Sequence, residues 1–177
     1  MSILRFLGLE TDRPAPAAAS PADAESVRRI AKALDSLGPD SAKRIAAFAF
    51  VLSRVAGADL KISGEETRRM ERIIMERAGL PEEQAVLVVE IARHQNMLFG
   101  GTDNFLVTRE IRQTATHEEK LELLRCLFAV SAADDSISTV EEGAITQIAS
   151  ELGIDRREMV QIRAGFRDQR AVFKKQP

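Results

Sequence analysis

Apolar side chains recur along most of this chain at intervals of three and four residues, the spacing that places them on one face of an α-helix. The first such stretch carries Val27, Ile30 and Leu34 and ends at Gly38-Pro39. The same spacing predicts further helices around the apolar residues of segments 45–55, 63–78, 81–91, 105–114, 121–128, 145–152 and 159–166.

One run of apolar residues, Val86-Leu87-Val88-Val89, has the composition of a buried strand. Glutamate and glutamine side chains directly before the run, and Glu90 directly after it, instead favour a buried helix. No other segment suggests a strand. The sequence therefore predicts an all-α fold, a helical bundle of about seven to eight helices.

The chain also contains an internal repeat. Residues 55–66 and 130–141 share valine, alanine, aspartate, isoleucine, serine and glutamate in register, and a glycine break follows each segment, at Gly79 and Gly153. Each unit consists of an apolar helix, an acidic break, a second helix, a glycine break and a third helix. The repeat predicts two units, at about 41–92 and 118–166, related by a pseudo-twofold axis.

The acidic breaks of both units have the same spacing, an aspartate followed four residues later by serine and seven residues later by glutamate. A serine followed three residues later by glutamate forms a capping box, in which the two residues bond each other's backbone amides at a helix start. Thr116 and Glu119 have this spacing without a preceding aspartate. The repeated residues are Asp59, Ser63 and Glu66 in the first unit and Asp134, Ser138 and Glu141 in the second.

The aspartates need a further explanation, because a carboxylate at the end of a helix is disfavoured by the helix dipole by up to about 1 kcal/mol. A tight turn can offset this cost, and so can a bound cation. If the breaks lie close together, their charges must be neutralised by an ion or by arginines such as Arg68 and Arg69. The candidate metal ligands are Asp59, Glu66, Asp134 and Glu141, with Ser63, Ser138, Asp135 and Glu142 as supporting residues.

Oxygen ligands of this kind suit a divalent cation such as Ca²⁺, Mg²⁺ or Mn²⁺ better than Zn²⁺. The spacing differs from an EF-hand, in which the last glutamate follows the first aspartate by eleven residues. Capping with turn formation and cation binding both remain open as interpretations of the acidic breaks.

Composition excludes several classes of protein. The 177 residues carry 25 basic and 27 acidic side chains, so a nucleic-acid partner is not expected. The single cysteine, Cys126, fits a reducing compartment and a place in the core. No apolar run approaches the roughly 20 residues that span a bilayer, and the N-terminus lacks a signal-peptide pattern. We therefore expect a cytoplasmic protein, and we identify no catalytic residues.

The ends of the chain differ from its helical body. Residues 1–10 are apolar, residues 11–22 form a linker rich in proline and alanine, residues 23–167 form the helical domain, and residues 168–177 form a basic tail. The apolar segment predicts docking on the core or on a protein partner, or weak contact with a membrane surface. The sequence leaves the oligomeric state open.

The repeated Asp-x-x-Ile-Ser-x-x-Glu after an apolar helix resembles the TerB-like family, named for tellurite-resistance protein B. The resemblance covers about residues 45–166. It implies an all-α fold of two similar halves, divalent-metal binding at the acidic positions, and a role in tellurite and stress resistance in the cytoplasm or at the inner-membrane surface. The family often has glycine directly after the aspartate, where this chain has Leu60 and Asp135.

Together these observations predict a non-enzymatic stress-resistance module that binds a divalent cation between its halves. The alternative is a metal-free scaffold that binds proteins, as co-chaperones do. Calorimetric titration with metal would separate the two.

Overall fold

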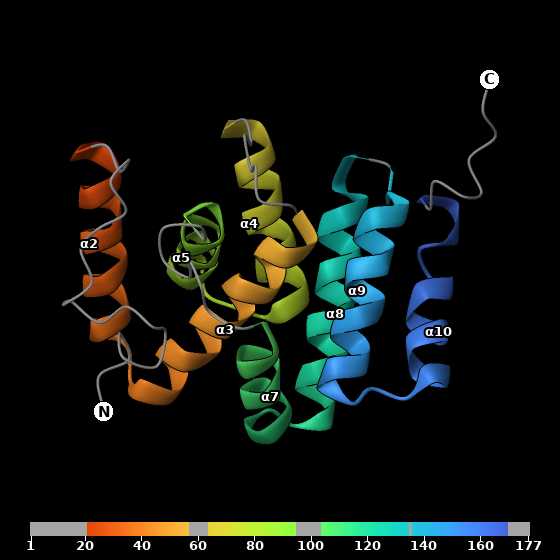
Figure 1. Cartoon of the computed structure of the whole chain (residues 1–177). Helices are drawn as coiled ribbons and strands as arrows, with labels where there is room; N and C mark the ends of the chain where they lie inside the picture. Colours follow the sequence, from red (N-terminus) through yellow and green to blue (C-terminus); the bar gives the residue numbers. More distant parts are fainter. Residues whose placement is uncertain (1–20, 57–63, 95–103, 135, 170–177) are drawn as a thin grey trace.

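The computed structural model describes residues 21–56, 64–94, 104–134 and 136–169, and every regular element within these ranges is helical. This part of the chain forms eight α-helices and two short 3₁₀ helices, which confirms the all-α prediction (Figure 1). The elements are α2 (Pro21–Ser36), α3 (Pro39–Ala56), α4 (Gly64–Ala78), α5 (Glu82–Arg93), α7 (Asn104–Thr114), α8 (His117–Ser131), η1 (Ala132–Asp134), α9 (Thr139–Leu152), α10 (Arg156–Ala164) and η2 (Arg167–Gln169).

Two glycines end helices as the sequence predicted. Gly79 directly follows α4 with φ +63°, and Gly153 caps α9 with φ +74°. Glycine adopts this left-handed conformation without steric cost, and the turn lets the last carbonyls of the helix find partners. Local sequence is therefore sufficient to end the second helix of each unit.

Two predicted boundaries were wrong by a few residues. Helix α2 begins at Pro21, so the predicted linker 11–22 includes the first two residues of a helix. Proline is tolerated there because the first helical amides have no acceptor in any case. Helix α10 ends at Ala164, so Phe166 lies beyond the helix to which its spacing assigned it. Gly165, a poor helix former, follows α10 directly.

Helix α3 lies at the centre of the bundle, packed against α5, α7, α8 and α9 (Figure 1). Its spacing predicted one buried face, which includes Phe48 and Leu52. All residues from 45 to 52 are buried, and Phe50, on the opposite face, is only 1% exposed. A helix that is surrounded by other helices needs apolar residues on every side.

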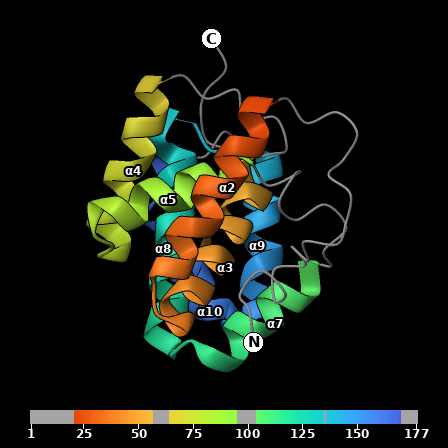
Figure 2. The same ribbon diagram turned by 90° about the vertical axis from the view of Figure 1, so that its left-hand side faces the viewer.

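The second helices of the two units, α4 and α9, both begin at the upper end of the molecule in Figure 1. Helix α8 packs against both of them, and α3 also packs against α9. Helix α2 covers α5 at one end of the bundle (Figure 2), while α10 lies at the other end against α8 and α9. The pseudo-twofold relation between the units stays a prediction.

Helix α8 contributes several of the most deeply buried side chains of the core. Leu124, Leu127 and Phe128 are fully buried. Cys126 is buried among them, and this burial raises the pKa of its thiol to about 12. The thiol therefore stays protonated at neutral pH, and its predicted place as a small core residue is confirmed.

Candidate functional site

The second acidic break joins α8 to α9. The 3₁₀ helix η1 follows α8 directly, and Ile137 is only 1% exposed, so this side chain anchors the break to the core. Ser138 then adopts an extended conformation as the N-cap of α9. The start of α9 is thus held by one buried side chain and one cap.

Ser138 and Glu141 form the capping box that their spacing predicted. The Ser138 hydroxyl accepts a hydrogen bond from the Glu141 amide at 3.1 Å, and Glu141 Oε2 accepts one from the Ser138 amide at 2.8 Å. The capping interpretation is confirmed in this unit. The capping bond does not exclude metal binding by Glu141, because a carboxylate offers about four acceptor positions.

Two further helices begin with the same device. Thr116 and Glu119 cap α8 as predicted, and the Thr116 backbone amide, followed by its hydroxyl, holds the pKa of the Glu119 carboxyl below its usual range. Asp155 and Glu158 cap α10. Sequence analysis missed this third box, although the three-residue separation of Asp155 and Glu158 is the signal that identifies it.

An arginine lies beside the second acidic break, but it is neither of those that the sequence suggested. Arg68 and Arg69 are exposed on α4. The guanidinium of Arg163, on α10, instead lies 3.4 Å from the carboxylate of Glu142, in the first turn of α9. Sequence analysis missed this pair because the two residues are 21 positions apart.

The other predicted ligands belong to residues or side chains that lie outside the described part of the chain. Asp59, Ser63 and Asp135 lie outside the described residues, as do the side chains of Glu66 and Asp134. Among the side chains that are described, no three histidine, cysteine, aspartate or glutamate residues are grouped as metal ligands. Convergence of the two breaks therefore stays a prediction.

Ser131, the last residue of α8, precedes the break and buries its hydroxyl. It is 5% exposed, and its Oγ makes no hydrogen bond within the described part of the chain. A buried polar atom without a partner costs about 1–3 kcal/mol. The aligned residue of the first unit is Ala56, which has no such group.

We therefore expect Ser131→Ala to raise the free energy of unfolding by about 1 kcal/mol, because it removes an unpaired buried hydroxyl. Urea denaturation would measure the change. The matched control is Ser53→Ala, since the buried Ser53 hydroxyl donates to the Phe50 carbonyl at 2.7 Å. The free energy of unfolding of this control should fall by about 1 kcal/mol. Destabilisation by Ser131→Ala would contradict an unpaired hydroxyl.

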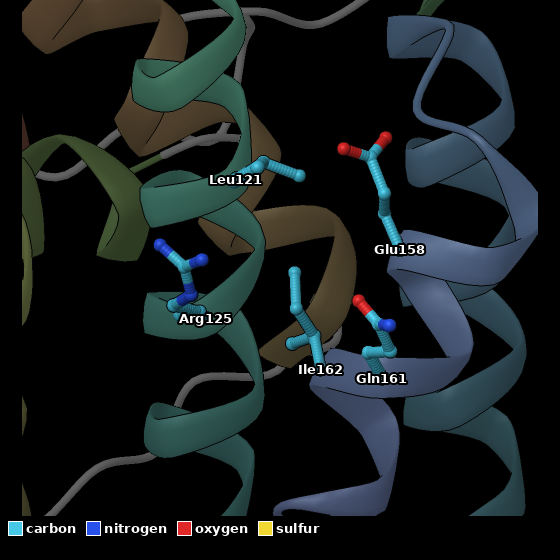
Figure 3. Close-up of a pocket in the computed structure, with 5 residues that line it drawn as sticks. All are labelled: Leu121, Arg125, Glu158, Gln161 and Ile162. Carbon is cyan, nitrogen blue, oxygen red and sulfur yellow. The ribbon is translucent and has the colours of Figure 1, made fainter.

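A groove of about 240 Å³ lies between α8 and α10. Its charged side chains are already engaged: Arg125 contacts Glu118 and Glu122, and the carboxylate of Glu158 lies 2.7 Å from His117 Nε2. Among the described residues, no serine, threonine, cysteine or lysine lines it. The lining residues are Leu121, Arg125, Glu158, Gln161 and Ile162 (Figure 3).

No helix within the described residues is long and apolar enough to cross a membrane. The apolar segment 1–10, for which membrane or partner contact was predicted, lies outside these residues.

Comparison with known proteins gives a match to a protein family. A family model described as tellurite resistance protein TerB matches residues 44–164, well over half of the chain and both repeated units. No curated protein and no solved structure shows a significant match.

Proposed function

The chain belongs to the TerB family, and from this premise we propose that it is a non-enzymatic module of tellurite and stress resistance that binds a divalent cation at its two acidic breaks. The observation that carries the proposal is the repeated Asp-x-x-x-Ser-x-x-Glu spacing. It spans the starts of α4 and α9, two helices that begin at the same end of the molecule (Figure 1). The proposal places the protein in the cytoplasm, including the inner-membrane surface.

The chemistry of the donors supports this assignment. The proposed ligands, Asp59, Glu66, Asp134 and Glu141, supply only carboxylate oxygens, which suit Ca²⁺, Mg²⁺ or Mn²⁺. The capping box holds the Glu141 carboxylate near the start of α9 while leaving acceptor positions on it. A bound cation would neutralise carboxylates that follow α3 and α8 in the chain, where the helix dipole disfavours negative charge.

Isothermal titration calorimetry of the full chain with Ca²⁺, Mg²⁺ and Mn²⁺ tests the proposal. We expect saturable heat with at least one ion, and we expect Asp59→Asn/Asp134→Asn to abolish it. Glu119→Gln is the control, because it removes a carboxylate charge from a capping box that no aspartate precedes. Absence of heat at millimolar metal would refute cation binding.

A metal-free protein-interaction scaffold is the second candidate. It is favoured by the partners that the described acidic side chains already have, since Glu141 bonds the Ser138 amide and Glu142 pairs with Arg163. These contacts stabilise the start of α9 without an ion.

Glu141→Gln separates the two candidates. Glutamine retains the capping geometry but removes the charge, so the free energy of unfolding without metal should change little. Cation binding predicts that the variant loses the rise in melting temperature that metal gives the wild-type protein. The scaffold predicts no metal-dependent rise in either protein.

A further inference from the structure

We propose that α10 and the turn that follows it, residues 156–166, form a hinged latch, a segment that opens as a unit and uncovers the apolar face of α8 while the other helices stay folded. The first observation is how little α10 buries. It has nine residues, and Met159 alone is buried. The corresponding third helix of the first unit, α5, has twelve residues, of which six are buried. Local opening requires little free energy where few apolar side chains are buried.

The contact between α10 and α8 is also incompletely packed. The groove of about 240 Å³ runs between the two helices, with Leu121 on one side and Ile162 on the other (Figure 3). Where a gap separates apolar side chains, each loses the dispersion contacts that a close-packed interface provides. By contrast, α5 packs against α2, α3 and α4.

Besides the buried Met159 and the packing of Ile162 against the core, three side-chain contacts hold the latch closed. Two are polar: the Glu142–Arg163 ion pair and the contact of His117 with Glu158, in which 59% and 32% of the two side chains are accessible. Exposed ion pairs contribute about 0–1 kcal/mol. The third contact is aromatic. The contacts are His117–Glu158, Glu142–Arg163, and Phe128 stacked on Phe166 with ring centroids 5.4 Å apart.

The chain provides a hinge at the base of the latch. Residues 153–155 join α9 to α10, and Gly153 has the left-handed backbone conformation. Ile154 is 8% exposed, so it keeps the hinge attached to the core while α10 moves. Large changes in backbone angles at such short connections are how hinged elements open.

Opening would also separate Arg163 from Glu142, one residue from Glu141. The latch is therefore connected to the corner of the molecule that carries the second acidic break. The proposal does not depend on cation binding, because each contact that holds α10 is between protein side chains.

Hydrogen exchange of the full chain, followed by mass spectrometry, tests the latch. A nine-residue helix that has left α8 does not hold its own hydrogen bonds in water, so each opening exposes its amides to exchange. Amides of α10 should therefore exchange about a hundredfold faster than those of α5, because local opening leaves most of the free energy of unfolding intact. Low urea concentrations should accelerate exchange in α5 more than in α10, since opening of the latch exposes less surface than unfolding of the whole domain. Equal rates with equal urea dependence would show that α10 opens only when the whole domain unfolds.

Substitutions of single side chains test which contacts hold the latch closed. Arg163→Gln and Phe166→Leu should each accelerate exchange in α10 by about three- to tenfold and leave α5 unchanged, because each removes one contact of the closed latch. Arg156→Gln is the matched control, since it removes the same charge from an exposed position of the same helix. Equal acceleration in α5 and α10, or no acceleration in either variant, would overturn the proposal.

Discussion

Glu151→Ala is expected to lower the free energy of unfolding by about 3 kcal/mol, because it leaves a nearly buried arginine without its partner. The guanidinium of Arg54, on α3, donates two hydrogen bonds to the Glu151 carboxylate, on α9, at 2.7 and 3.0 Å. The two side chains are only 9% and 16% exposed. Gln147 donates a further bond to the same carboxylate at 3.0 Å. The pair thus joins the central helix to the second unit.

The control is an ion pair of similar chemistry at the surface. Glu118→Ala removes one partner of Arg125, whose side chain is 36% exposed, and should cost less than about 1 kcal/mol. The double variant Arg54→Leu/Glu151→Leu should recover part of the stability, because removing both partners leaves no unpaired charge, while the buried Thr108 hydroxyl loses one acceptor. If Glu151→Ala cost no more than Glu118→Ala, burial would not strengthen the Arg54–Glu151 pair.

The same carboxyl predicts a pH dependence. Hydrogen bonds, first from the Arg54 guanidinium and also from Thr108 and Gln147, hold the pKa of Glu151 below its usual range. A folded-state pKa below the unfolded value stabilises the protein at pH values above the unfolded pKa of about 4.3. This contribution disappears as pH falls through the folded pKa.

We therefore expect the stability difference between the wild-type protein and Glu151→Gln to be constant near neutral pH and to shrink below about pH 4.3. Urea denaturation at a series of pH values would measure it. A difference that stayed constant down to acid unfolding would contradict the lowered pKa.

Phe50→Ala is expected to destabilise the protein by about 4 kcal/mol, the usual range for emptying a buried phenylalanine site. Phe50 is 1% exposed and lies on the face of α3 opposite the one that its apolar spacing predicted as buried. If α3 were an amphipathic surface helix, this substitution would change the free energy of unfolding by no more than about 0.5 kcal/mol. The expected effect of Phe50→Ala on the free energy of unfolding therefore differs by several kcal/mol between a buried α3 and an amphipathic surface helix.

Chemical denaturation of Phe50→Ala would measure the effect, with Val140→Ala as the exposed control. Val140 is 79% exposed, so its truncation should change stability by less than about 0.5 kcal/mol. Similar small effects for both variants would show that Phe50 is not in the core.

Local sequence determined the helices. Apolar spacing placed each helix within a few residues, and Gly79 and Gly153 ended two of them. The capping boxes at Thr116 and Ser138 were predictable for the same reason, since their partners lie three residues away. These features depend on contacts within one helical turn, which the order of residues specifies directly.

Only the tertiary structure decided which helices meet and what their side chains contact. The sequence could not place Arg54 against Glu151, 97 residues away, or Arg163 against Glu142. Nor did the spacing of apolar residues show that α3 is buried on all sides along residues 45–52, because spacing specifies a face and not how many neighbours a helix has. Such contacts depend on how helices far apart in the chain pack, so no local pattern encodes them.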